Sequence, residues 1–264
     1  MNTRLTPDAW PMPRSSSPTR MRSVRDSGGT GPVIVLLHGF LASSGYWNRL
    51  EPHLVASGYR VIAVDLLGFG LAPKPQRSRY GYPEHVAYID SVVARLGLRQ
   101  PFLLVGHSMG ALIAARYALE HEQRVEALVL LNPPLYRDAQ EARAVLRRTG
   151  RVYRFLLDSR FRQFGWSLLP TITFFRISRH SLRSRELSLR NVIERSGIDD
   201  DLARLGTRTL LLVGLRDRPE YGVNLRSWAR NSQVTVLTAD VSHHSPVMRP
   251  RQVADAVDAF ARGA

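Results

Sequence analysis

The sequence predicts an α/β fold: a doubly wound, mostly parallel sheet with a helical cap insertion. Two observations lead to this prediction. Short apolar runs rich in β-branched residues recur along the chain, and helical patterns lie between most of them. Continuous apolar runs are typical of strands that are buried on both faces of a parallel sheet. The predicted strands are Val33–Leu37, Tyr59–Val64, Phe102–Val105, Ala127–Leu131, Thr209–Val213 and Val234–Leu237.

The helices are predicted from apolar spacing. Val86, Ile89 and Val93 recur at spacings of three and four, which indicates a helix with one buried face. An Ala-rich helix is expected over Met109–Glu120, and the last helix is expected to follow Pro250, because proline suits a first helical turn. Strands and helices that alternate in this way are joined by right-handed crossovers.

Composition divides the chain into three parts. Residues 1–18 are rich in proline, serine and arginine and cannot bury a core, so we expect a flexible tail. The core begins with a short edge strand within Arg20–Asp26. The alternation of strand and helix is interrupted over 137–206, and a long insert in a regular α/β array is usually functional. We expect residues 137–206 to form a helical cap inserted in a core of 19–136 and 207–264.

The composition also excludes several classes of protein. The formal net charge of +15 comes almost wholly from arginine, since Lys74 is the sole lysine, and the arginines are spread along the chain. We therefore expect no nucleic-acid partner. The lack of cysteine excludes disulfides, thiolate metal sites and a cysteine nucleophile. The sequence has no transmembrane segment and no apolar secretory signal, so we expect a cytoplasmic protein.

A serine lies where a strand turns sharply into a helix. Gly106-His107-Ser108-Met109-Gly110 follows the predicted strand Phe102–Val105 and opens the predicted helix Met109–Glu120. A turn of this kind holds the serine in strained backbone geometry with its hydroxyl exposed, and the flanking glycines let the strand and helix approach closely. Ser108 is therefore the predicted nucleophile.

A serine hydroxyl needs a base, and the base needs a third group to orient it. Behind a serine turn of this kind, the acid and then the histidine follow in chain order. Asp217 follows the strand Thr209–Val213 in Gly214-Leu215-Arg216-Asp217, and His243 and His244 follow the strand Val234–Leu237. Both positions lie past the carboxyl ends of strands, where open α/β sheets build their sites.

Five motifs follow one another along the chain: Val35–Phe40, Asp65–Gly70, Gly106–Gly110, Gly214–Asp217 and the loop with His243 and His244. With these motifs in family order, nearly the whole chain from about Arg20 onward resembles the α/β-hydrolase superfamily, in its compact, cap-bearing branch of esterases, lipases and lactonases. The chain departs from the family pattern at Ala72, where the family carries serine, and at Ser242, where it carries glycine. The resemblance implies an oxyanion hole formed by the backbone amides of Phe40 and Met109.

Two landmarks of the family's histidine loop disagree about the base. A proline two residues after the histidine favours His244, which is followed by Pro246, whereas a proline seven residues after it favours His243, which is followed by Pro250. We choose His243, with His244 as second choice, because Pro250 opens a helix that must dock in a fixed place. Adjacent side chains of an extended loop point in roughly opposite directions, so only one reaches Ser108.

The sequence favours a cofactor-independent serine hydrolase that cleaves a carboxylic ester, thioester or lactone with an apolar acyl part through an acyl-enzyme. Two alternatives stay open. One is a biosynthetic acyltransferase or cyclase-type enzyme on the same triad, and the other is a triad-bearing ligand-binding receptor with negligible turnover. Haloalkane dehalogenases and epoxide hydrolases of the superfamily use an aspartate nucleophile, so Ser108 argues against both.

The expected partner is a small apolar ester-type substrate. The arginines from Arg143 to Arg195 are expected to form mainly a solvated face, and one or two of them would contact a carboxylate or phosphate if the substrate carries one. No cofactor or metal is expected, because the histidine spacing gives no ligand pattern, and His38 and His107 are assigned no chemistry. No motif in the sequence specifies the substrate's identity or the oligomeric state. Six aromatic residues of the insert either line an acyl pocket or form the insert's own core: Phe155, Phe161, Phe164, Trp166, Phe174 and Phe175.

Overall fold

The computed structural model describes residues 21–148, 178–218, 221, 224 and 231–263. The predicted tail over 1–18 and the six aromatic residues of the insert lie outside the described residues.

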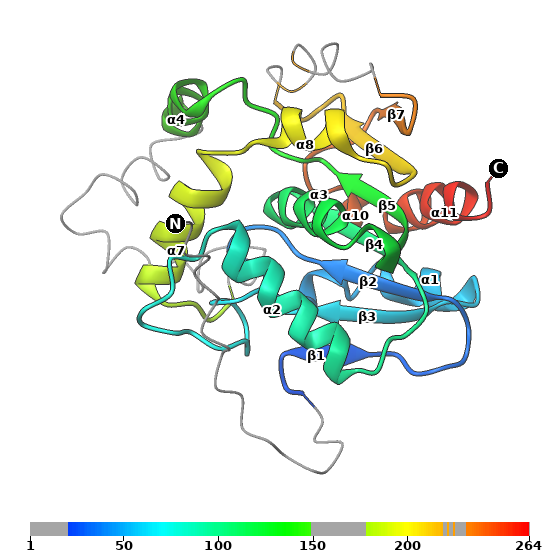
Figure 1. Cartoon of the computed structure of the whole chain (residues 1–264). Helices are drawn as coiled ribbons and strands as arrows, with labels where there is room; N and C mark the ends of the chain where they lie inside the picture. Colours follow the sequence, from blue (N-terminus) through cyan, green and yellow to red (C-terminus); the bar gives the residue numbers. More distant parts are fainter. Residues whose placement is uncertain (1–20, 149–177, 219–220, 222–223, 225–230, 264) are drawn as a thin grey trace, which may run out of the picture.

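The core of the protein is a seven-stranded sheet in the order β1-β3-β2-β4-β5-β6-β7 (Figure 1). Strand β1 runs antiparallel to β3 at one edge, and the other neighbouring pairs are parallel. The predicted mostly parallel sheet is confirmed. The strands are β1 (Val24–Asp26), β2 (Val33–Leu37), β3 (Arg60–Val64), β4 (Phe102–His107), β5 (Val125–Leu131), β6 (Thr209–Gly214) and β7 (Val234–Ala239).

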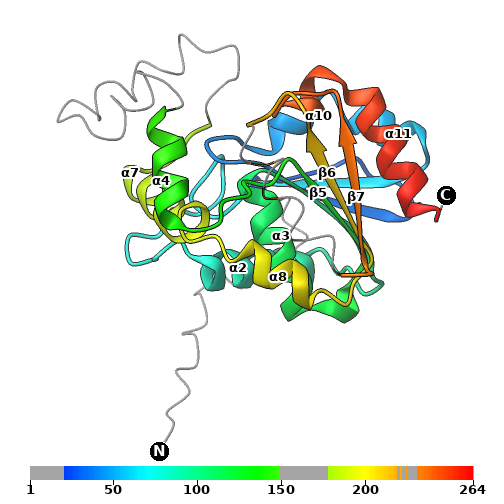
Figure 2. The same cartoon turned by 90° about the horizontal axis from the view of Figure 1, so that it is seen from above.

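Helices cover both faces of this sheet, so the doubly wound arrangement is confirmed as well (Figures 1 and 2). Alternate residues of the strands explain the two layers, because successive side chains point to opposite faces. Val35 and Leu37 pack in the cluster beneath α2, α3 and α8, whereas Ile34 and Leu36 pack in the cluster beneath α1 and α11. These helices are α1 (Glu51–Ala56), α2 (Tyr82–Arg95), α3 (Met109–Glu120), α8 (Ile198–Arg204) and α11 (Pro250–Ala261).

The described part of 137–206 is mainly helical and adds no strand to the sheet, although His180 forms an isolated β-bridge with Phe69. It contains α4 (Ala139–Arg148), α7 (Leu182–Ser188), the π-helical turn η3 (Leu189–Ile193) and α8. Helices α4 and α7 both lie outside the sheet (Figures 1 and 2). In contrast, α8 packs against α3, where Arg116 Nη2 lies 2.8 Å from Asp201 Oδ1. The insert therefore divides into helices outside the sheet and one helix of the covering layer.

The parallel strands direct several loops to one edge of the sheet. The carboxyl ends of β2, β4, β5, β6 and β7 lead into the segments that hold Phe40, Ser108, Asn132, Asp217 and His243. Open α/β sheets place ligands at this edge. The fold thus gathers residues that are far apart in the sequence.

Candidate active site

Ser108 lies in the turn between β4 and α3, with backbone angles φ 52° and ψ −122°. Non-glycine residues rarely adopt this strained region, and Ser108 is held there by its N–H, which donates to the Leu131 carbonyl at 3.0 Å. A Cβ on Gly106 would lie 2.4 Å from the Gly110 carbonyl oxygen, and one on Gly110 would lie 2.3 Å from the Leu37 oxygen. Only glycine therefore fits at both flanking positions.

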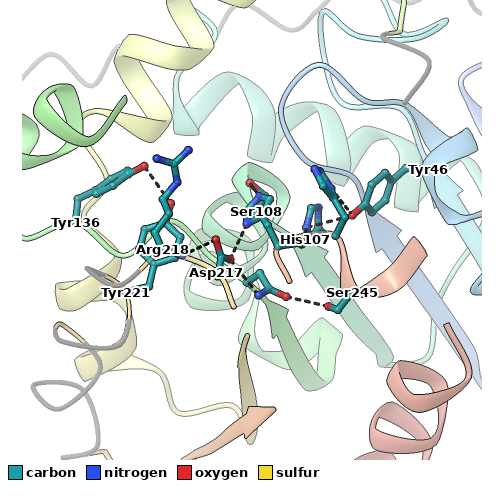
Figure 3. Close-up of polar contacts among 11 residues, drawn as sticks. Tyr46, His107, Ser108, Tyr136, Asp217, Arg218, Tyr221 and Ser245 are labelled. Carbon is teal, nitrogen blue, oxygen red and sulfur yellow. Dashed lines mark hydrogen bonds and ion pairs between the residues drawn. The ribbon is translucent and has the colours of Figure 1, made fainter. Parts of the chain in front are cut away.

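A chain of hydrogen bonds joins Ser108, His243 and Asp217 (Figure 3). His243 Nδ1 lies 2.7 Å from Asp217 Oδ2, and His243 Nε2 lies 3.1 Å from Ser108 Oγ. A carboxylate only accepts, so Nδ1 carries the imidazole hydrogen and Nε2 is left to accept the hydrogen of the serine hydroxyl. This arrangement points Nε2 of the His243 imidazole at Ser108 Oγ, where it can take up the hydroxyl proton.

The Asp217 carboxylate is buried and surrounded by donors. Burial alone would raise its pKa, but the hydrogen bond and the charge of His243, the Arg218 N–H at 2.9 Å and Asn132 Nδ2 at 3.1 Å outweigh it, so the pKa of Asp217 is lowered. Asn132 is itself oriented, because its Oδ1 accepts from Ser245 Oγ at 3.0 Å (Figure 3). Asp217 is thus held ionised behind the imidazole.

His244 faces away from this chain. Its Nδ1 lies 3.3 Å from the hydroxyl of Tyr46. Burial, together with the neighbouring His243, lowers the pKa of His244 to about 4, so the ring is neutral near pH 7. The structure brings His243, and not His244, into contact with both Ser108 and Asp217.

Two backbone amides beside Ser108 are unengaged. Among the described residues, the N–H groups of Phe40 and Met109 donate no hydrogen bond. Phe40 lies in a turn that is closed by the Ala42 N–H on the Gly39 carbonyl at 3.2 Å, and Met109 is the first residue of α3. These are the two amides that the sequence resemblance implies for an oxyanion hole.

Buried polar side chains brace the loop that carries Phe40. His38 donates from Nδ1 to the Gly39 carbonyl at 2.7 Å, and its Nε2 accepts from the Leu66 N–H at 2.9 Å. Asp65 accepts from the Ser44 N–H at 2.6 Å. His38 is neutral in this role, because burial lowers its pKa. These contacts fix the position of the Phe40 amide.

Ser108 and His243 line a cavity of about 550 Å³. This volume is within the usual range for a small-molecule site. No carboxylate is among its described lining residues, and Arg49 is its one arginine. Arg49 has no carboxylate partner within the described ranges. Residues of the cavity wall include Phe40, Leu41, Tyr46, Arg49, His107, Ser178, His244 and Val247.

A family profile described as the alpha/beta hydrolase fold matches residues 32–185, which is more than half of the chain. The chain belongs to the α/β-hydrolase family. The family is an enzyme superfamily of hydrolases, and its fold agrees with the seven-stranded sheet described above.

Known proteins similar to this chain have different activities in their names. The chain is 36% identical over 146 residues to a probable lysophospholipase, BODYGUARD 2, of Arabidopsis thaliana, an alignment that covers 52% of this chain and 31% of the relative. It is 40% identical over 114 residues to a haloalkane dehalogenase of Mycobacterium marinum, covering 43% of this chain and 38% of the relative. Each alignment spans less than two fifths of the relative's length.

A solved α/β-hydrolase structure has the same fold. The bromoperoxidase of Bacillus anthracis superposes with a TM-score of 0.70 at 22% identity, covering 90% of this chain and 94% of the other. At this identity the likeness shows the fold alone.

Three residues of the site had no role in the sequence interpretation. Asn132 supports Asp217, and its place directly after β5, at the site edge of the sheet, is a signal that was available. Tyr46 and Arg49 line the cavity but belong to no motif of the hydrolase family that we recognised. His107 was assigned no chemistry, and its contacts are described below.

The described ranges contain no group of three or more metal-ligating side chains that is arranged to hold a metal ion. In the same ranges, every helix is too short or too polar to cross a bilayer.

Proposed function

We propose that this α/β-hydrolase is a serine hydrolase that cleaves a carboxylic ester, thioester or lactone with an apolar acyl part. The observation that carries the proposal is the hydrogen-bond chain from Ser108 through His243 to Asp217, at 3.1 Å and 2.7 Å. A serine, a base and an orienting acid in this arrangement are the requirements of nucleophilic acyl transfer.

In the proposed acylation step, Ser108 Oγ bonds to the substrate carbonyl carbon while the hydroxyl hydrogen passes to His243 Nε2. The negative charge that develops on the carbonyl oxygen is stabilised by the amides of Phe40 and Met109. When the tetrahedral intermediate collapses, the bond to the leaving group breaks and His243 returns the proton to the leaving oxygen or sulfur. Asp217 stabilises the imidazolium that forms between these events.

In the proposed deacylation step, water repeats the sequence in reverse. His243 takes a proton from water, the oxygen bonds to the acyl carbon, and Ser108 leaves with the proton that His243 returns. An alcohol or amine acceptor in place of water would make the same site an acyltransferase. The choice between the two depends on which nucleophile enters the cavity.

We infer that the preferred substrates carry an anionic group. Arg49 supports this, because it lines the same cavity as Ser108 without a carboxylate partner among the described residues. The lysophospholipase name of the Arabidopsis relatives agrees with an ester that bears a phosphate, whereas the dehalogenase name does not imply an ester. The serine at position 108 favours the ester.

We also infer that residues 137–206 act as the cap of the site. Ser178, from this segment, lines the cavity, and its N–H donates to the Leu41 carbonyl at 2.9 Å. Helices α4 and α7, which belong to the same segment, lie outside the sheet. The helix α8 would instead anchor the end of the cap to α3.

The test is a fluorophosphonate probe combined with p-nitrophenyl esters of increasing acyl length. The probe should add one label per chain on Ser108, and Ser108→Ala should lower hydrolysis about a millionfold. Sustained turnover supports an enzyme, whereas a single stoichiometric burst supports a receptor. Labelling at another residue, or an active Ser108→Ala variant, would remove Ser108 from the role.

A further inference from the structure

His107, the residue before the proposed nucleophile, makes a hydrogen bond to the backbone of the proposed base. Its side chain is buried, and its Nε2 lies 2.8 Å from the carbonyl oxygen of His243. Among the described residues, no other hydrogen bond reaches this carbonyl. The contact joins the two halves of the site, because position 107 lies on β4 beside Ser108 and position 243 lies in the loop after β7.

The hydrogen positions around His107 follow from its partners. A carbonyl oxygen only accepts, so His107 Nε2 carries the hydrogen. The Tyr46 hydroxyl, 3.3 Å from the same Nε2, therefore accepts from it and donates to His244 Nδ1, which is also at 3.3 Å. This one assignment satisfies the three contacts, and in it His107 and His244 are both neutral.

The ring of His107 is fixed in this state. It stacks on Tyr46 with a centroid distance of 4.7 Å and an interplanar angle of 19°. Its Nδ1 faces Gly39, where an added Cβ would lie 3.0 Å away. Burial, with His243 close by, lowers the pKa of His107 well below its ordinary value, so the ring stays a neutral donor.

We propose that His107 is a positioning residue, which holds His243 against Ser108 by donating its Nε2 hydrogen to the His243 carbonyl. The inference rests on the proposed function, since it assigns His243 as the base. The His243 ring must stay at 3.1 Å from Ser108 Oγ, and displacing a reacting group by about 1 Å costs roughly a hundredfold in rate. His107 constrains the backbone from which that ring projects.

Three variants of His107 test the donor. His107→Leu removes it, His107→Gln keeps an N–H near the place of Nε2, and His107→Asn keeps an amide that is one methylene too short. We expect kcat to fall about 10- to 100-fold in His107→Leu and His107→Asn, with KM little changed, and His107→Gln to recover most of the loss. The fluorophosphonate labelling rate of Ser108 should fall in parallel.

His121→Leu is the matched control. His121 also stacks on a tyrosine, Tyr117, at a centroid distance of 4.5 Å, but it lies at the far end of α3 from Ser108. This variant should keep the wild-type kcat. Melting temperatures show whether each protein is folded, and if His107→Leu does not fold, the comparison of His107→Gln with His107→Asn decides.

Equal losses in all three His107 variants, or a wild-type kcat in His107→Leu, would overturn the positioning role. Neither result would touch the proposed function, which fails separately if the wild-type protein neither labels at Ser108 nor turns over an ester.

Discussion

The proposed base is tested most directly by comparing His243→Ala with His244→Ala. The two residues are adjacent, both are imidazoles, and both lie at the cavity. His243→Ala removes the contacts at 2.7 Å to Asp217 and 3.1 Å to Ser108. Loss of a triad histidine costs about a millionfold in kcat, which corresponds to about 8 kcal/mol of transition-state stabilisation.

His244→Ala removes much less. Its hydrogen bond with the Tyr46 hydroxyl, at 3.3 Å, contributes about 1 kcal/mol to stability. Even if that whole amount were transferred to the transition state, the rate would change by less than about tenfold. The expected ratio between the two variants is therefore at least about five orders of magnitude.

The assay is steady-state hydrolysis of a short p-nitrophenyl ester at neutral pH, with Ser108→Ala as the blank for residual hydrolysis. The two variants should also differ in the rate at which a fluorophosphonate labels Ser108: labelling should be slow in His243→Ala but not in His244→Ala. If His244→Ala is the inactive protein, or if the two are equally impaired, the assignment of His243 is wrong even though the ring contacts Ser108.

Two further predictions concern charge at the site. Asn132→Asp places a carboxylate where an amide donates to Asp217 at 3.1 Å, so it should raise the lowered pKa of Asp217 and cost about 3–5 kcal/mol of stability near pH 7. The lowered pKa of Asp217 stabilises the folded state at pH values above the unfolded pKa of about 3.9, and this stability is lost as pH falls through the lowered pKa. The difference in melting temperature between Asn132→Asp and wild type should therefore shrink below pH 4. A difference in melting temperature that stays constant with pH would contradict this. Arg49→Gln should lower kcat/KM about 3- to 10-fold for mono-p-nitrophenyl glutarate but not for p-nitrophenyl butyrate, with the exposed Arg251→Gln as control. Equal effects on the two esters, or no loss of preference in high salt, would exclude an electrostatic role for Arg49.

The strands were predictable from the sequence because a parallel sheet buries both faces. β2 has the predicted limits, and β3 and β6 differ from them by one residue at one end. β4 continues to His107, past the apolar run, because His107 pairs with Leu131 of β5. Pairing with a neighbouring strand extends an element beyond what side-chain apolarity marks.

The insert was predictable only in its helical character. α8 was grouped with the cap, yet it packs on α3 through the ion pair of Asp201 with Arg116 and through Ile198 and Leu202 in the core cluster. A helix over the site and a helix over the sheet have similar amphipathic patterns, so local sequence does not separate them. The distinction depends on which surface each one meets.

The candidate site was predictable where it follows chain order and strand ends, and not where remote loops meet. Ser108 comes directly after β4 and Asp217 three residues after the end of β6, so topology alone brings them to one edge. Tyr46 reaches His107 and His244 from the 3-10 helix η1 (Ser44–Trp47), which follows β2, at 3.3 Å from each. Because contacts between remote segments have no period or fixed spacing along the sequence, no local sequence pattern predicts them.

The histidine loop explains why its two proline landmarks conflict. Pro246 lies in the first turn of a four-residue helix, α10 (Ser245–Met248), where proline is favoured for its fixed φ. Pro250 opens α11, which packs on the sheet through Val253 and Val257. Pro246 therefore marks the start of the short additional helix α10, and Pro250 marks the start of α11, the helix that docks on the sheet.

Both sides of this loop are fixed to the sheet independently of the prolines. The Val241 carbonyl accepts from the Arg216 N–H at 3.1 Å, in the loop after β6, and Ser245 Oγ donates to Asn132, after β5, at 3.0 Å. Between these anchors only Ser242, His243 and His244 remain to cross the site edge. With so short a crossing, the first of the two imidazoles meets Asp217 and Ser108, and the second is carried toward Tyr46 as α10 begins. The register of the proposed base is thus set by the anchors on either side of it, which is why the position of the docked helix predicts the register better than the nearest proline does.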